Sequence, residues 1–145
     1  MTMMKRILAP IGVDEASEAV LPVVGALARD TGATVRLLRV FPVPEHVVGT
    51  HGRTVAYVDQ EMARLTGQGL EELARMETAL HGVPVERVVR FGDAEEEILV
   101  EAETFGADLI ALTSDRRGRL QSVLAPALAE RIARKAPVPT VVLRG

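Results

Sequence analysis

The sequence predicts an α/β fold in which a doubly wound, five-stranded parallel sheet carries helices on both faces. Short apolar runs of strand length alternate along the whole chain with longer stretches in which apolar residues recur at helical spacing. This alternation implies parallel strands joined by right-handed crossovers. The length of 145 residues and the apolar fraction of 48% fit a single domain, residues 1–145, with its own core.

The expected strands end at glycine, proline or polar residues, which interrupt a strand. The first strand does not alternate between apolar and polar positions, so we expect it to be buried on both faces. Pro10 has no backbone donor and should lie at the end of that strand. The expected strands cover residues 7–11, 35–41, 85–91, 109–112 and 140–143.

The first two expected helices each contain residues that conflict with a regular helix. Asp14 is a good N-cap for the first and Gly32 a good C-terminal stop, but Pro22 between them lacks a donor and should bend the helix. In the second helix, residues 55–80, Gly67 and Gly69 each cost about 1 kcal/mol relative to alanine. The apolar faces expected here are Ala16, Val20, Val23 and Leu27, and then Met62, Leu65, Leu73, Met76 and Leu80.

The last two expected helices flank the fourth strand. The third follows a tight turn at Gly92 and Asp93 and stops at Gly106. The fourth covers residues 123–132 and ends before the prolines at 137 and 139. Their expected apolar faces are Ala94, Ile98, Ala102 and Phe105, and then Leu124, Leu128 and Ile132.

A candidate ligand crevice follows from this topology, because ligands of such sheets lie above the carboxyl ends of the strands where the winding reverses. If the first strand is central, its neighbours are the second and the fourth, and residues 12–14 and 113–121 line the crevice. The candidate crevice residues are Pro10, Gly12, Asp14, Val40, Leu112, Thr113, Ser114, Arg116, Arg117, Arg119 and Ala127.

Composition excludes several classes of function. The chain has no cysteine, so it has no disulfide scaffold and no thiolate nucleophile. Its net charge of −3 and its lack of tryptophan argue against a nucleic-acid-binding surface. The apolar run before Pro10 is too short for a signal peptide or a membrane span, and we expect a soluble cytoplasmic protein.

Five separated blocks of the sequence resemble the universal stress protein family, in order and at compatible spacing. They are residues 7–11 with 15–19, 106–110, 129–132 and 136–142. The resemblance implies the sheet order 3-2-1-4-5, in a fold similar to the adenine-nucleotide alpha hydrolases. It also implies a small cytoplasmic homodimer, made in response to stress, that often binds ATP and pairs through its last strand.

The departures from the family pattern fall on its nucleotide site. Nucleotide-binding members carry Asp where this chain has Gly12. After the fourth strand they carry Gly, two residues, Gly, nine residues, and then Gly-Ser or Gly-Thr. The four corresponding residues here are Thr113, Arg116, Pro126 and Ala127.

Each of these departures removes something that a phosphate needs. Glycines let backbone N–H groups approach phosphates, whereas Arg116 adds bulk, Pro126 has no N–H and Ala127 has no hydroxyl. Charge-assisted hydrogen bonds are worth roughly 1.5–3 kcal/mol each, so losing two or three weakens binding roughly 10²- to 10⁵-fold. We therefore expect no cofactor, and no ATP bound in the family's usual way.

The basic loop with Arg116, Arg117 and Arg119 has two interpretations. Guanidinium groups could replace the lost backbone donors and hold a small anionic ligand or a nucleotide. Alternatively, the loop is a solvated surface segment paired with Asp115.

Other polar residues give no sign of catalysis or metal binding. The spacing of His46, His51 and His81 fits no standard ligand pattern, and no carboxylate cluster accompanies them. Neither Ser17 nor Ser122 lies in a nucleophile turn. The three acids at residues 95–97 favour the positive end of a helix and should face water.

The end of the chain predicts self-association. Val138, Val141 and Leu143 form an apolar edge strand, which invites pairing with a second copy. We expect a non-enzymatic, dimeric stress-response or signalling protein that binds a partner protein or a small ligand other than ATP. The alternatives are a nucleotide-binding member with a rebuilt phosphate site and, last, an adenylating enzyme of the wider group.

Overall fold

The computed structural model describes residues 4–12, 19–44, 53–114 and 126–144. In this part of the chain, five parallel strands form one sheet in the order β3-β2-β1-β4-β5, as predicted. The strands are β1 (Arg6–Pro10), β2 (Thr34–Phe41), β3 (Val85–Phe91), β4 (Leu109–Ser114) and β5 (Thr140–Arg144), and the helices are α2 (Val20–Thr31), α3 (Arg53–Glu77), α4 (Ala94–Phe105) and α5 (Pro126–Lys135).

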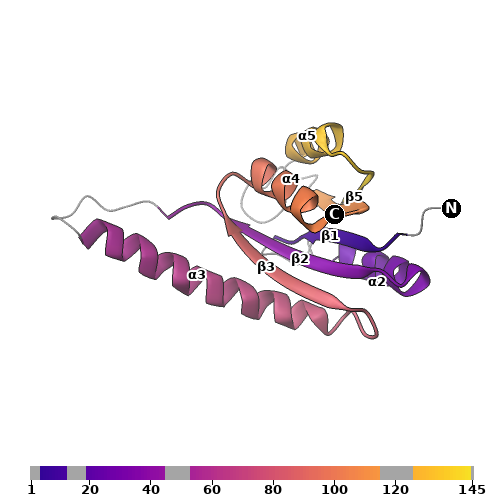
Figure 1. Cartoon of the computed structure of the whole chain (residues 1–145), viewed down its shortest axis with the longest axis horizontal. Coiled ribbons are helices and arrows are strands. Elements are labelled where there is room, and N and C mark those ends of the chain that lie inside the picture. The colour runs from indigo at the N-terminus through magenta and orange to yellow at the C-terminus, as the bar shows by residue number, and fades with distance from the viewer. Residues whose placement is uncertain (1–3, 13–18, 45–52, 115–125, 145) are drawn as a thin grey trace.

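The helices form a layer on each face of the sheet (Figure 1). The helices α2 and α3 cover one face and α4 and α5 the other, so the core is divided into two apolar clusters. Ile7 and Ala9 of β1 face the α2 layer, whereas Leu8 between them faces α4. The first strand is therefore buried on both faces, as its lack of alternation predicts, and Pro10 ends it.

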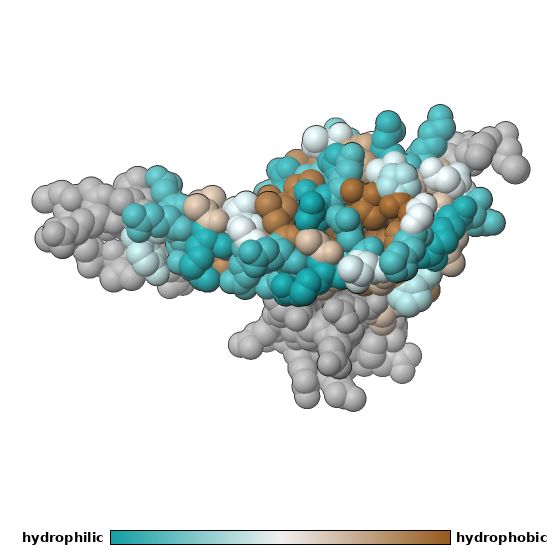
Figure 2. Space-filling view, turned by 90° about the horizontal axis from the view of Figure 1, so that it is seen from below, coloured by the Kyte–Doolittle hydropathy of each residue, from teal (hydrophilic) through white to brown (hydrophobic). Residues whose placement is uncertain are grey.

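The helix α3 extends well beyond the sheet at its N-terminal end (Figure 1). Figure 2 shows that this projecting part is mainly hydrophilic, whereas apolar residues gather on the body of the molecule. Leu73, on the part of α3 that lies against the sheet, is fully buried. The helix ends at Glu77, three residues before the predicted end, and Leu80 lies in the following turn, where it is still buried.

The apolar face of α2 differs from the prediction. The helix begins at Val20 and turns Val20, Leu21 and Val24 toward the core, so Val23 is left 37% exposed. Pro22 consequently lies in the first turn of the helix, where proline is tolerated. The predicted cap Asp14 lies outside the described residues.

Glycines end two helices where the sequence predicts it. Gly32 after α2 and Gly106 after α4 both have positive φ, and their N–H groups donate to carbonyls of the last turn. Asp93 caps the start of α4 by accepting a hydrogen bond from the N–H of Glu96.

Candidate functional site

The candidate crevice lies at the carboxyl ends of β1 and β4. The strand β1 has β2 on one side and β4 on the other, so the winding of the sheet reverses here. Beyond the end of β1, the N–H of Ile11 donates to the carbonyl of Leu38, which keeps the chain attached to β2 as it leaves the sheet. The predicted reversal point is therefore confirmed.

The predicted crevice residues that the structure describes are mostly buried. Pro10 and Leu112 are buried, and Val40 is half-buried against the α4-side cluster. Gly12, at the end of the described segment after β1, is also half-buried. The described residues at this end of the sheet are thus mainly apolar.

Thr113 is polar, unlike the four residues that precede it in β4, Leu109 to Leu112. It is 4% exposed, and its hydroxyl has no hydrogen-bond partner among the described residues. It belongs to β4, because that strand continues to Ser114, two residues past the predicted end. The extra length is stabilised by pairing with β5, where Thr113 is opposite Leu143 and Ser114 is opposite Arg144.

The remaining predicted residues are described only in part or not at all. Asp14, Arg116, Arg117 and Arg119 lie outside the described residues, as does the side chain of Ser114. The helix α5 begins at Pro126, as the comparison with the family's phosphate motif assumes. Ala127 is the second residue of that helix, and its side chain also lies outside the described part.

The strand β5 contains two of the three residues expected to form an apolar edge. The strand is at the edge of the sheet, and its outer side pairs with no strand in the described chain. Val141 and Leu143 are half-buried against the α2-side cluster. Val138 is not part of the strand, because β5 begins at Thr140, and it packs instead against the α4-side cluster.

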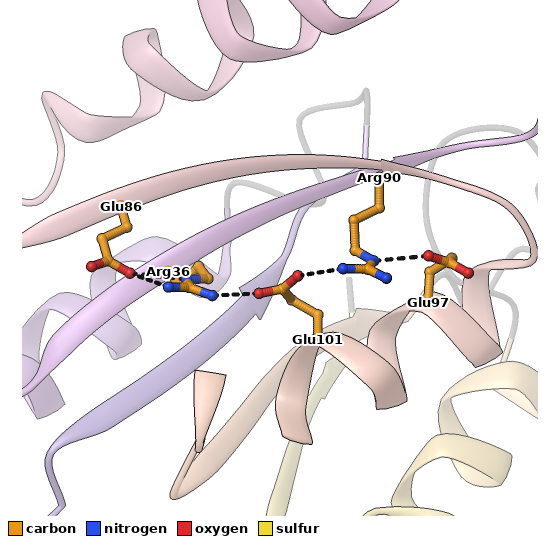
Figure 3. A network of polar contacts seen from close by, with 5 residues as sticks. All are labelled: Arg36, Glu86, Arg90, Glu97 and Glu101. Carbon is orange, nitrogen blue, oxygen red and sulfur yellow. Dashed lines mark hydrogen bonds and ion pairs between the residues drawn. The ribbon is translucent and has the colours of Figure 1, made fainter. Parts of the chain in front are cut away.

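A network of alternating charges, which sequence reasoning missed, joins α4 to the sheet (Figure 3). We call it the charge network, and it consists of Glu86, Arg36, Glu101, Arg90 and Glu97. Arg36 donates to Glu86 over 2.6 Å and to Glu101 over 2.5 Å. Arg90 donates to the other oxygen of Glu101 over 3.0 Å and to Glu97 over 2.8 Å. The two strands β2 and β3 are thereby bound to one helix.

Glu101 is the centre of the charge network, because both arginines bind it and only 3% of its side chain is exposed. The pKa of Arg36 is raised: burial opposes its charged form, and the hydrogen bonds to Glu101 and Glu86 outweigh that effect. The pKa of Arg90 is raised chiefly by its bond to Glu97. The guanidinium of Arg36 also lies 4.1 Å from the ring centre of Phe105.

The charge network has a signal in the sequence. Arg36 lies between Val35 and Leu37 in one expected strand, and Glu86 and Arg90 are four residues apart, on one face of another. Glu97 and Glu101 are one helical turn apart. The prediction that the acids at 95–97 face water is wrong for two of them. Glu95 binds Arg131 and Lys135 of α5, and Glu97 folds back to bind Arg90.

No group of three or more histidine, aspartate or glutamate side chains that could hold a metal ion occurs in the described ranges. Within the same ranges, no helix is both long and apolar enough to cross a membrane.

Comparisons with known proteins agree with this geometry. The model of the universal stress protein family matches residues 3–144. A comparison with curated protein sequences finds no match. Solved structures share the fold, and three of them illustrate the likeness.

The first, hypothetical protein MJ0577, has a TM-score of 0.79 at 23% identity, over 99% of this chain and 98% of that chain. UspA from Lactobacillus plantarum has a TM-score of 0.71 at 18% identity, over 99% and 100%. A universal stress protein from Archaeoglobus fulgidus, solved in complex with dAMP, has a TM-score of 0.62 at 16% identity, over 98% of each chain. The family match over almost the whole length, together with the sheet order, shows that this chain belongs to the universal stress protein family.

Proposed function

We propose that this protein is a non-enzymatic, dimeric stress-response or signalling factor that does not hold ATP in the family's usual way. The observation that carries the proposal is the start of α5 at Pro126. A helix N-terminus binds an anion through its first free N–H groups, and proline removes one of them. Thr113 adds a buried side chain where nucleotide-binding members have bare backbone.

A thermal-shift titration with ATP, ADP, AMP and cyclic AMP tests this proposal. A ligand at 100 times its dissociation constant stabilises a fold by about 2.7 kcal/mol. We expect no shift of the wild-type unfolding temperature at millimolar ATP. A clear shift, or nucleotide turnover above a buffer control, would contradict the proposal.

A variant that restores the family motif provides the positive control. It carries Thr113→Gly, Arg116→Gly, Pro126→Gly and Ala127→Ser. These changes return bare amides and a hydroxyl to the four positions, so ATP should stabilise this variant and not the wild type. Each protein is compared with itself in the absence of ATP, because the glycines will lower its intrinsic stability.

A second candidate function is a nucleotide-binding protein with a rebuilt site made from Gly12, Asp14, Ser114 and the loop of residues 116–119. The buried, unpartnered hydroxyl of Thr113 favours it, since such a group needs a partner. The dAMP complex of a protein with this fold gives it further support. The double variant Arg116→Ala, Arg117→Ala tests the loop, and unaltered affinity for every anionic ligand would end this candidate.

A further inference from the structure

We infer that the outer face of α2 and the α2-side of β5 form one apolar surface, which a second copy of this chain covers. This inference rests on the proposed function above, a dimeric factor, and it names the surface through which the two copies meet. We call this surface the apolar step, and it consists of Pro22, Val23, Ala26 and Leu27 of α2 with Val141 and Leu143 of β5.

The helix α2 carries no charge where a surface helix usually carries one. Residues 19–28 contain only alanine, valine, leucine, glycine and proline. By contrast, Glu96 and Glu103 occupy exposed positions of α4. A helix that is apolar on all sides is expected to be buried on all sides. In the single chain, however, three of these residues are exposed, namely Pro22, Val23 and Ala26.

The contacts of α2 show which way its apolar side turns. The Nε of Arg29 donates to the carbonyl of His81, in the turn after α3, over 2.9 Å, and Gly25 lies one turn before Arg29 on the same side. Residues two apart on a helix differ by about 200°, which places them on nearly opposite sides. Val23 and Leu27 therefore lie on the side away from α3. Because α3 packs on β2 and β3, and α2 on β1 and β4, this side is turned toward β5.

The strand β5 continues the apolar surface at a lower level. Val141 and Leu143 face the α2-side of the sheet and are half-buried there, whereas Val142 faces the other side, from which α5 packs on the strand. The raised helix α2 and the lower strand β5 thus lie side by side, and their described side chains in the apolar step carry no charge.

The size of the β5 edge shows why a dimer needs this surface. A strand of five residues is about 17 Å long, and a sheet is about 10 Å thick, so the edge presents roughly 170 Å². A stable interface takes about 800 Å² from each partner. The apolar step adjoins the edge, because Val141 and Leu143 belong to both, and it supplies the additional area.

The shape of the apolar step fits a second copy of the same chain. A twofold axis parallel to the plane of the sheet places the raised α2 of each copy over the lower β5 of the other. Each apolar part then meets an apolar part, as an isologous interface requires. A partner that presented charged side chains to this surface would bury them without a counter-charge, at a high cost.

Sedimentation equilibrium tests the inference by comparing Val23→Glu and Ala26→Glu with the wild type. Val100→Glu is the matched control, because Val100 is 44% exposed on α4, in the other helix layer, and Val23 is 37% exposed on α2. Each glutamate enters a symmetric interface twice, so both α2 variants should raise the dimer dissociation constant at least about a hundredfold. Val100→Glu should leave that constant unchanged, and far-ultraviolet circular dichroism should show all three variants folded.

Three results would overturn the inference, and they are distinguishable. Dimers of Val23→Glu and Ala26→Glu as tight as the wild type would show that another surface joins the copies; the dimeric factor would stand, and the apolar step would be free for a different protein. Equal weakening by Val100→Glu would show that added negative charge, rather than loss of the apolar step, separates the copies. A wild type that sediments as a single chain at micromolar concentration would reject the dimer and the inference together.

Discussion

Two glycines in α3, only two residues apart, should respond in opposite ways to the same substitution. An ideal Cβ built on Gly69 lies 2.9 Å from Cε2 of Phe41 and 2.9 Å from Cγ2 of Val89. An ideal Cβ on Gly67 has nothing within 4 Å. Gly69 therefore lies in close contact with the sheet, whereas Gly67 faces open space.

The magnitudes follow from these distances. Alanine is favoured over glycine by about 1 kcal/mol in a helix, so Gly67→Ala should stabilise the protein by about that amount. Gly69→Ala has the same gain but overpacks the core, which costs roughly 1–3 kcal/mol. Phe41 has little room to yield, because it is buried, stacks on Phe91 at 5.8 Å and carries the guanidinium of Arg39 on its ring. The net effect of Gly69→Ala should lie between neutral and about 2 kcal/mol destabilising.

Urea unfolding followed by far-ultraviolet circular dichroism measures both variants, since the chain has no tryptophan to report by fluorescence. The informative quantity is the difference in unfolding free energy between the two alanine variants, which should be roughly 1–3 kcal/mol in favour of Gly67→Ala. A Gly69→Ala protein as stable as Gly67→Ala would refute the close approach of α3 to β2 and β3.

Three further predictions concern the charges and the edge of the sheet. Glu101→Ala should lower the unfolding free energy by roughly 2–3 kcal/mol, because it removes the partner shared by two half-buried arginines. Glu86→Gln, at the exposed end of the charge network, should lower it by less than about 1 kcal/mol. Urea unfolding measures both variants, and equal losses of unfolding free energy would contradict the central role of Glu101. Asp108 accepts hydrogen bonds from the N–H groups of Lys5 and Arg6, which hold its pKa below the ordinary 3.8. The ionised Asp108 carboxylate therefore stabilises the fold above pH 3.8, and this stabilisation is lost as the pH falls through the lower pKa of the folded state. Asp108→Asn should therefore lower the unfolding free energy fully at pH 7, and the difference from the wild type should shrink below pH 3.8. A difference that does not change with pH would disprove this. Sedimentation equilibrium of the wild type should give twice the chain mass of 15.6 kDa at micromolar concentration, and a single-chain mass would rule out the proposed dimer.

The sequence predicts the sheet well because its strands are set by local signals. The runs at 35–41 and 85–91 are bounded by turn residues, and both agree with β2 and β3 to within one residue. The end of β4 could not be predicted, since Thr113 and Ser114 are polar and their place in the strand is seen only in their pairing with β5. The buried face of α2 could not be predicted either, because it depends on the residue at which the helix begins. That residue decides whether Val23 or Val24 faces the core.

The polar contacts were harder to predict than the fold. Glu97 reads as a helix-start acid on local grounds, and only the packing of α4 on the sheet shows that it reaches Arg90. Whether the hydroxyl of Thr113 has a partner is likewise a property of the whole fold, because it depends on what every neighbouring segment brings to that point. The spacing of charged residues along one segment shows which of them share a face, but it does not show which residues of a distant segment they contact.

The two borders of the sheet differ in character, and this limits how such molecules can assemble. The border at β3 carries Glu86, Arg87 and Arg90, and charges of this kind discourage a further strand from adding there. The border at β5 carries Val141, Val142 and Leu143. If two copies pair through their β5 edges about a twofold axis, both apolar edges are occupied, so no further copy can add and the assembly is a dimer. A sheet with two receptive borders could instead polymerise without limit.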